Sequence, residues 1–364
     1  MQTEDISKIP MFFILGRPRS GTTLLTTLFN AHPNIRIAPE FPVMLFLYQR
    51  FKKVKKWDEG TIRTFVDHVF YFAKFHTRRV ENLKLDKELI IKELCKYKDN
   101  ASIQLFLKSI NYFAYSVYEK EETLWIGDKN PVYSISANRL RKIFPEAKFI
   151  CIIRDYRDNF VSIKKLAEKE VAVEAPVVSL QADRWRYFTR MFLGLKRRFP
   201  DKYCILRYED LVTEQEVTFR SLCDFLGIVY DPSVFDFHKK RDETVNAYGN
   251  YIYEKFHENL LKPVNTGRMN TWQNVLSGEE VMMADQIVGK YADQMGYERQ
   301  NKSFNFWLFL KSRPMITYDF FLIKLMIFGT YLPYKVSQWW FFNSLILLKT
   351  YLRFFGKKPL PKSL

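Results

Sequence analysis

The sequence predicts an α/β fold in which a central parallel sheet lies between two layers of helices. Short apolar segments of five or six residues alternate with longer stretches of helical periodicity, as is typical of parallel strands joined by crossover helices. Each apolar segment stops at a glycine, polar or charged residue. Because ligands of open α/β sheets bind at the carboxyl ends of the strands, we expect these residues to converge on one site.

Four segments are expected to form the buried strands. They are "MFFIL" (11–15), "TLWIG" (123–127), "KFICII" (148–153) and "KYCIL" (202–206). The residues that follow them are, in the same order, Gly16, Asp128 with Lys129, Arg154 with Asp155, and Arg207 with Tyr208 and Glu209.

The long connection between the first two of these strands is expected to be a helical insertion. It covers about residues 41–122, is rich in Phe, Tyr and Lys, and is too long for a simple crossover, so we expect it to cap the site. A later helix is expected over 277–296, where Ser277 and Glu280 form a capping box and Gly296 ends the helix. These features predict one domain over 1–300, followed by an extension over 301–364.

The extension is dense in aromatic residues between Phe304 and Phe355. Lys324, Lys335 and Lys349 interrupt it, so no apolar run reaches the roughly 18–20 residues of a membrane span. Tryptophans at 339 and 340 and these lysines suit a helix that lies in a membrane interface. A helix docked on the main domain, or a contact between two copies in a homodimer, explains the same pattern.

The charge and the cysteines restrict the partners and the compartment. A formal net charge of +17 over 364 residues indicates anionic partners, or a surface solvated by lysines, and no recognisable nucleic-acid-binding module is present. The four cysteines are scattered, without metal-ligand spacing, which favours a reducing compartment and argues against zinc. The first strand begins near Met11 and leaves no room for a signal peptide, so a cytoplasmic location is expected.

The stretch "FILGRPRSGTTLL" (13–25) is typical of a phosphate-binding loop. A strand, a glycine turn and a helix N-terminus present free backbone N–H groups to an anion. However, Thr22 stands where ATP-using P-loop enzymes carry a lysine, and Arg19 supplies the positive charge instead. Without that lysine, and without a plain magnesium-binding aspartate at a strand end, we expect the transfer of an anionic group that needs no metal.

"PRSGTT" followed by "AHPNIRIAPE" resembles the 5′-phosphosulfate loop of sulfotransferases that use PAPS (3′-phosphoadenosine-5′-phosphosulfate), and most closely that of the tyrosylprotein sulfotransferases and their bacterial allies. "IIRDYRDNFVSI" (152–163) resembles the segment of that family that holds the 3′-phosphate, through Arg154 and Ser162. The resemblance implies a P-loop-like three-layer fold, PAPS as co-substrate, PAP as product, and no metal. It also implies cofactor binding by the loop residues Gly16, Arg17, Pro18, Arg19, Ser20, Gly21, Thr22 and Thr23.

The resemblance also suggests catalytic residues. "GDKNP" (127–131) is similar to the family's lysine motif and gives Lys129 the catalytic lysine role, beside Arg19. Glu40 in "IAPEF" has the family's spacing for the base, while the histidine base of the cytosolic enzymes is absent after Lys129. "LRYEDL" (206–211) places Tyr208 near the nucleotide, and "KPVNTGRMNTW" (262–272) suggests that Arg268 or Asn265 closes over it.

The acceptor is less constrained than the donor. Aromatic runs at 41–51 and 65–75 and the aromatic extension favour a lipophilic alcohol such as a sterol or lipid, with a carbohydrate hydroxyl as the alternative. A P-loop kinase-like transferase and a catalytically silent, membrane-associated binding protein are the rival functions. The first predicts binding of ATP with magnesium, and the second predicts a site without turnover.

Overall fold

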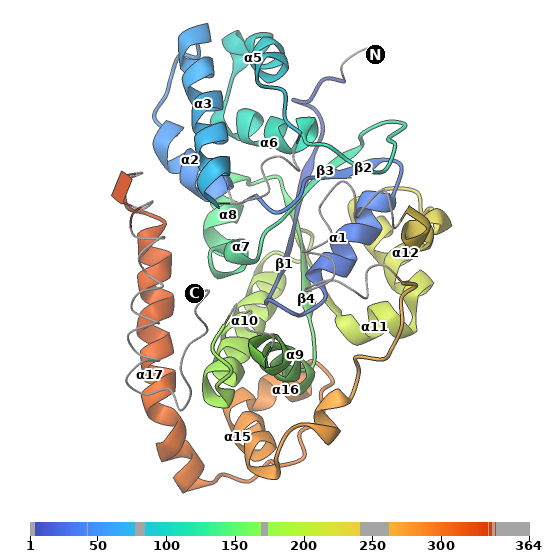
Figure 1. The fold of residues 1–364 in the computed structure, drawn as a ribbon, viewed down its shortest axis with the longest axis vertical. Coiled ribbons are helices and arrows are strands. Elements are labelled where there is room, and N and C mark those ends of the chain that lie inside the picture. The colour runs from blue at the N-terminus through green and yellow to red at the C-terminus, as the bar shows by residue number, and fades with distance from the viewer. Residues whose placement is uncertain are drawn as a thin grey trace.

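A computed structural model of the chain describes residues 4–41, 43–76, 84–168, 174–240 and 262–333, together with 335, 336 and 339. Trp340 and Lys349 of the predicted extension therefore lie outside the described residues. Within these ranges a parallel sheet occupies the centre of the molecule and helices cover both of its faces (Figure 1). The predicted α/β architecture is confirmed.

The sheet has five parallel strands in the order β2-β3-β1-β4-β5. Their bounds are β1 Met11–Gly16, β2 Ile35–Ile37, β3 Trp125–Lys129, β4 Lys148–Ile153 and β5 Tyr203–Arg207. The expected strand at 148–153 is confirmed with its bounds. The expected strands at 11–15 and 202–206 are also present as β1 and β5, with bounds that differ from the predicted ones by one residue. The second expected strand lies two residues later than predicted, so Asp128 and Lys129 belong to it, and β2 was not predicted.

Alternate residues of the central strands supply two separate cores. Phe13, Phe149 and Tyr203 face one side, where their rings stack with centroids 5.5 and 4.7 Å apart. Phe12 and Ile150 face the other side. Strands buried on both faces are continuous apolar runs, which is why these segments stood out in the sequence.

One face of the sheet is covered by the helices that follow β1 and β5. These are α1 (Thr22–Ala31), α11 (Tyr208–Thr213), α12 (Gln215–Leu226) and the 3₁₀ segment η2 (Pro232–Lys240). His32, just after α1, accepts a bond from the Asn34 backbone and contacts the Val229 carbonyl at 2.8 Å, so it fixes the turn there.

The other face carries the larger set of helices. They are α2 (Val43–Phe51), α3 (Glu59–His76), α5 (Lys87–Cys95), α6 (Ile103–Phe113), α7 (Pro131–Ile135), α8 (Ala137–Ile143), α9 (Tyr156–Glu168), α10 (Val178–Arg198), α15 (Gly278–Val288), α16 (Lys290–Gln294) and α17 (Phe306–Gly329), with short 3₁₀ turns η1 (Lys98–Asn100) and η4 (Thr271–Asn274). Helices α2 to α6 form the predicted helical insertion at one end of the molecule (Figure 1). Most of its described aromatic side chains lie in the core or pack against it. Among them, Phe51, Trp57, Phe65 and Phe106 pack on one another.

The predicted helix over 277–296 is interrupted. The capping box of Ser277 and Glu280 is present, but the first helix ends at Val288 and Gly289 has φ +55°. A second short helix, α16, follows, and Gly296 with φ +73° comes after it. Glycine adopts a positive φ without the steric penalty that other residues meet, so Gly289 ends the first helix, earlier than the predicted stop at Gly296.

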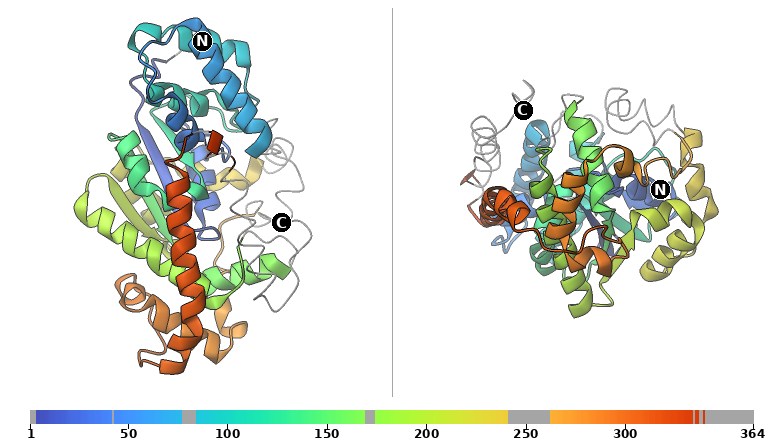
Figure 2. Two further views of the ribbon diagram at one scale, coloured as in Figure 1. Left: turned by 90° about the vertical axis from the view of Figure 1, so that its left-hand side faces the viewer. Right: turned by 90° about the horizontal axis from the view of Figure 1, so that it is seen from below.

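The extension beyond residue 300 begins with a helix of 24 residues, α17, which packs on α10 and α15 and runs along one edge of the molecule (Figures 1 and 2). In the part of the chain that the structure describes, no helix has the length and apolar character needed to cross a bilayer.

Candidate active site

The loop between β1 and α1 is shaped by two glycines that leave no room for a side chain. A Cβ on Gly16 would lie 2.9 Å from the Ile152 carbonyl oxygen, and one on Gly21 would lie 2.4 Å from the Tyr208 ring. Gly21 also has φ +93°, a conformation that favours glycine. These residues let the loop fold tightly over the ends of β4 and β5.

The N-terminus of α1 is open toward this loop. Gly21 is its N-cap and offers no side-chain hydrogen bond, and the first turn contains no acidic residue. The first N–H groups of a helix lack partners within the helix, and its dipole favours negative charge there. The loop and helix therefore have the geometry of a cradle for an anion.

Arginines gather beside the cradle. Arg154, directly after β4, donates to the Arg19 carbonyl at 3.1 Å and to the Arg268 carbonyl at 2.5 Å, and its guanidinium lies 4.8 Å from the Tyr208 ring centroid. Arg19 Nε donates to Ser162 Oγ at 3.1 Å. Burial, followed by the positive charges of Arg268 and Arg154, lowers the pKa of Arg19 to about 10. A bound polyanion would relieve this repulsion, so the residues fit a nucleotide phosphate.

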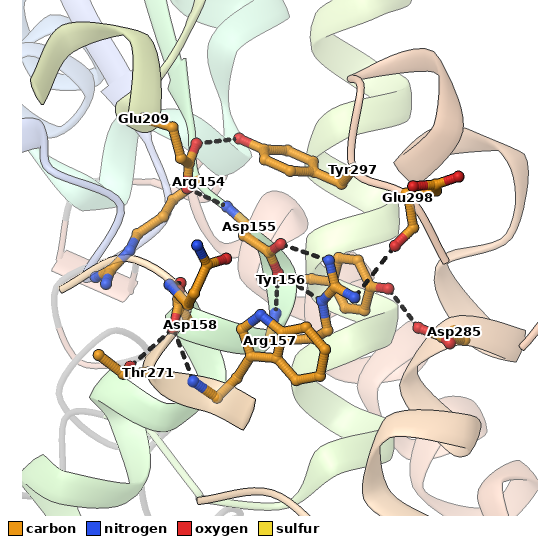
Figure 3. A network of polar contacts seen from close by, with 12 residues as sticks. Arg154, Asp155, Tyr156, Arg157, Asp158, Glu209, Thr271, Asp285, Tyr297 and Glu298 are labelled. Atoms are coloured by element: carbon orange, nitrogen blue, oxygen red, sulfur yellow. Dashed lines mark hydrogen bonds and ion pairs between the residues drawn. The ribbon is translucent and has the colours of Figure 1, made fainter. Parts of the chain in front are cut away.

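The segment that carries Arg154 and Ser162 is held by a buried polar network (Figure 3). Asp155 pairs with Arg157 at 2.7 Å, and Glu209 accepts the Asp155 N–H at 3.0 Å and the Tyr297 hydroxyl at 2.6 Å. Trp185 of α10 donates to the Arg154 carbonyl at 2.8 Å. The backbone of Arg154 is thus fixed from both sides.

Two residues of this segment were missed by the sequence analysis. Asn159 donates to the Pro18 carbonyl at 2.9 Å and to Ser20 Oγ at 3.2 Å, which ties α9 to the phosphate loop. Asp158 accepts bonds from the backbone of Asn270 and Trp272 and from Thr271 Oγ1, and so holds the loop that follows Arg268 (Figure 3). The only signal was two polar residues at the start of an otherwise amphipathic helix, "YRDNFVSI".

A second cluster brings Glu40, Lys129 and Thr23 together. Lys129 Nζ forms an ion pair with Glu40 Oε1 and lies 3.4 Å from Thr23 Oγ1, in the first turn of α1. The Lys129 side chain is 4% exposed and that of Glu40 is 32% exposed. The carboxylate is therefore the solvent-facing member of the pair, beside the anion cradle.

Asp128 points away from this cluster. It is paired in register with Phe13, whereas Lys129 is paired with Ile14, so the two side chains face opposite sides of the sheet. Burial raises the pKa of Asp128 to about 7, and the neighbouring Asn111, Tyr133 and Lys129 offset that rise only in part. The Tyr133 hydroxyl lies 3.4 Å from the Phe41 carbonyl and accepts the Met44 N–H at 3.2 Å, which supports the loop after Glu40.

The Arg17 side chain enters a buried charge network rather than the cradle. It donates to the Gln181 carbonyl at 2.9 Å and pairs with Glu174 at 3.2 Å. Glu174 also pairs with Arg184 at 3.1 Å, and Arg184 pairs with Asp319 of α17 at 2.8 Å. A chain of alternating charges thus links the phosphate loop to the C-terminal helix.

The remaining predicted residues fall into two groups. Pro18, Ser20, Thr22 and Thr23 lie in the loop or in the first turn of α1, and Tyr208 packs against Gly21. Asn265 is exposed and donates to the Pro263 carbonyl at 3.2 Å, whereas the Arg268 carbonyl contacts Arg154. Of the two alternatives, Arg268 is the one that lies at the cradle.

Comparison with known proteins identifies relatives. Residues 10–232 match the sequence profile of the sulfotransferase family. Protein-tyrosine sulfotransferase 1 of Danio rerio is 26% identical over 273 residues, which cover 72% of this chain and 66% of the relative. The human protein of the same name is 25% identical over 80% of this chain and 70% of its own length. The chain thus spans about two thirds of the length of these relatives.

Two solved structures share the fold. The sulfotransferase domain of the Synechococcus PCC 7002 olefin synthase covers 82% of this chain with a TM-score of 0.54 and 22% identity, and the match spans 98% of that domain. The sulfotransferase domain of the curacin biosynthetic pathway covers 80% with a TM-score of 0.50 and 20% identity, again over 98% of its length.

Proposed function

Because the chain belongs to the sulfotransferase family, whose co-substrate is PAPS, we propose that its site transfers the sulfuryl group of PAPS to the hydroxyl of a lipophilic alcohol. The observation that carries the proposal is the Lys129–Glu40 pair beside Thr23, at the mouth of the anion cradle. It puts a carboxylate that can accept a proton next to a cation, Lys129, that can stabilise developing negative charge.

The donor is assigned to the cradle by charge and shape. The backbone of Gly16 to Thr23 and the N-terminus of α1 would hold the 5′-phosphosulfate, and Arg154 with Ser162 would hold the 3′-phosphate. Arg17 would contribute its backbone, since its side chain is engaged by Glu174 and Gln181. Tyr208 and Arg268 complete the nucleotide side.

The proposed chemistry is an in-line displacement. Glu40 takes the proton of the acceptor hydroxyl as its oxygen bonds to sulfur, and the bond between sulfur and the 5′-phosphate oxygen breaks. Lys129 and Arg19 stabilise the charge that builds on the sulfuryl and bridging oxygens, and PAP departs. Positioning and electrostatics supply the rate enhancement.

The aromatic, basic surface of α17 supports a lipophilic acceptor. The insertion does not support it, because most of its described aromatic residues lie in the core or pack against it. A protein tyrosine is the second candidate acceptor, because the two relatives described above are named protein-tyrosine sulfotransferases. A carbohydrate hydroxyl remains the third. All four cysteines are free thiols, which fits the proposed cytoplasmic location.

The test is transfer of labelled sulfate from PAPS to a panel of sterols and lipid alcohols in vesicles, tyrosine peptides and sugars, with Glu40→Gln beside the native chain. Label in the lipid alcohols that disappears with Glu40→Gln supports the proposal. Label only in peptides or sugars overturns the acceptor class but leaves the donor assignment intact. Failure to bind PAP in a calorimetric titration would overturn the donor site itself.

A further inference from the structure

The outward side of α17 exposes large apolar side chains in unusual number. Trp307 is 76% exposed and Phe321 64%, and Phe306, Leu310, Phe320 and Phe328 are all more than two-fifths exposed. Scattered apolar residues are normal on a protein surface, but a contiguous group of this kind marks an interaction site. All of these residues belong to α17, the helix that runs along one edge of the molecule (Figure 1).

The helix has two sides of opposite character. Phe306, Leu310, Phe321 and Phe328 recur at spacings that place them on one side of an α-helix. Leu308, Ser312, Asp319, Leu322 and Ile323 are buried on the other side, toward α10 and α15. We define the outer face of α17 as Phe306, Leu310, Phe320, Phe321 and Phe328.

Basic residues accompany the outer face. Arg313 and Lys324 lie among its aromatic side chains: the Arg313 guanidinium lies 3.9 Å from the Phe309 ring centroid, and Lys324 Nζ lies 5.5 Å from that of Phe320. Lys311 pairs with Glu279 at the border of the face. The one acidic residue of the helix, Asp319, is fully buried and paired with Arg184. The exposed side of α17 is therefore apolar and cationic.

We propose that the outer face of α17 binds an anionic membrane surface, with the helix lying in the headgroup region. Its aromatic side chains would enter the boundary of the acyl chains, and Arg313 and Lys324 would reach the lipid phosphates. A chain with net charge +17 is attracted to such a surface as a whole.

A second copy of the chain fits this face less well than a membrane does. In a two-fold dimer the same patch meets itself, so two patches that both carry Arg313 and Lys324, and no exposed acidic residue of α17, would be brought together. The proposal deepens the proposed function, since a lipophilic acceptor would be collected at that membrane. The binding itself requires neither PAPS nor turnover.

Sedimentation of the full chain with vesicles tests the proposal. We expect it to bind vesicles of phosphatidylcholine with phosphatidylserine more tightly than phosphatidylcholine alone, and less tightly at high salt. The double variant Phe320→Ser/Phe321→Ser should lower the partition coefficient at least tenfold. Arg313→Gln and Lys324→Gln should each lower it about fivefold, as expected for one charge near an anionic surface.

The matched control is Val217→Ser on α12, which is 66% exposed and lies on the opposite side of the molecule from α17 (Figure 1). It should leave vesicle binding unchanged, and circular dichroism should show that all variants keep the native melting curve. Vesicle binding that is equal in the α17 variants and the native chain would overturn the proposal. The proposal would also be overturned if size-exclusion chromatography without lipid showed a dimer, and if the same substitutions dissociated that dimer.

In either of those cases PAP binding and sulfate transfer to a soluble acceptor remain measurable. A chain that binds vesicles but transfers no sulfate to any acceptor would count against the proposed function alone.

Discussion

At the scale of single residues, the site depends on two charged groups that lie next to each other in space but 89 positions apart in the chain. Glu40 and Lys129 meet because β3 lies beside β1, and because Glu40 follows the short edge strand β2 that flanks β3. Spacing from Arg19 was enough to nominate Glu40, since the resemblance fixes its position in the motif. Neither the ion pair nor its contact with Thr23 was predictable, because β2 has only three residues and gave no clear pattern.

Replacing Glu40 with Gln is expected to remove the proposed proton acceptor while keeping the shape of the side chain. General-base catalysis contributes about 10²–10⁴-fold, so kcat/KM should fall by about that factor. The affinity for PAP should change little, because Glu40 lies on the acceptor side of the cradle. Steady-state kinetics and PAP titration check both values.

Glu146→Gln serves as the control, since that carboxylate is 92% exposed and pairs with Lys202 before the amino ends of β4 and β5, whereas the site lies at the carboxyl ends of the strands. Native activity in the Glu40→Gln chain would mean that another group accepts the proton.

Asp128 should make the stability of the fold depend on pH. Its pKa is raised by burial to about 7 from a usual value near 4, so it stays protonated in the folded chain while it ionises in the unfolded chain. Stability is therefore full below about pH 4 with respect to this group and falls as pH rises toward 7. The loss amounts to about 4 kcal/mol, at 1.36 kcal/mol for each pKa unit.

The variant Asp128→Asn removes this dependence. Relative to the native chain, its free energy of unfolding should rise steadily between pH 4 and pH 7. Urea unfolding across that range measures the difference, and a constant difference would show that the carboxyl titrates normally.

At the scale of elements, the sequence predicted best what is apolar and regular. Segment 148–153 is a continuous apolar run and forms β4 with the expected bounds. The strand before it lies two residues later than predicted, because the charges of Asp128 and Lys129 predict the end of the strand at Gly127, yet both residues are buried inside β3. Charged residues are buried in strands mainly at functional sites, and local strand propensity does not predict them.

The charged link between the phosphate loop and α17 could not be predicted from the sequence. Arg17 lies in the phosphate loop, Glu174 just before α10 and Arg184 in α10, and the packing of α17 on α10 adds Asp319 to them. Burial raises the pKa of Asp319 to about 6, although Arg184 opposes the rise. The C-terminal helix is thus attached to the donor site by charge as well as by apolar contact.

Breaking that link is expected to cost stability and donor affinity together. Asp319→Asn leaves Arg184 short of one counter-charge in a buried position, which should destabilise the fold by about 3 kcal/mol. The freed Arg184 competes with Arg17 for Glu174, so PAP binding should weaken several-fold. Urea unfolding and calorimetric titration of PAP give the two numbers.

Thr317→Val, on the exposed side of the same helix, should change neither quantity. A loss of stability with unchanged PAP affinity would show that the network supports the helix but does not position the loop.

At the scale of the whole molecule, composition anticipated the charge but not its distribution. A net charge of +17 predicts anionic partners or a surface solvated by lysines. In the structure part of that charge is gathered at the cradle, in Arg19, Arg154 and Arg268, and part accompanies the outer face of α17. Like charges held this close oppose the compact state.

The melting temperature should therefore rise when sodium chloride is increased from low to physiological concentration. Screening of self-repulsion worth about 1 kcal/mol would raise Tm by about 2 °C in a chain of this size. Scanning calorimetry in sodium chloride and potassium chloride measures the effect, which should be equal in both. Sulfate is excluded from the comparison because it can occupy the phosphate loop. A melting temperature that falls with salt would mean that attractive ion pairs dominate.

The network from Arg17 to Asp319 also has a consequence for biosynthesis. Arg17 and Asp319 lie 302 positions apart, so once Arg184 has been synthesised the nascent chain holds two arginines against a single carboxylate, Glu174, until Asp319 follows 135 residues later. The charges balance only when Asp319 of α17 has emerged. Until then the phosphate loop is incompletely braced, and a chain that stalls before α17 would be a preferred client of chaperones and proteases.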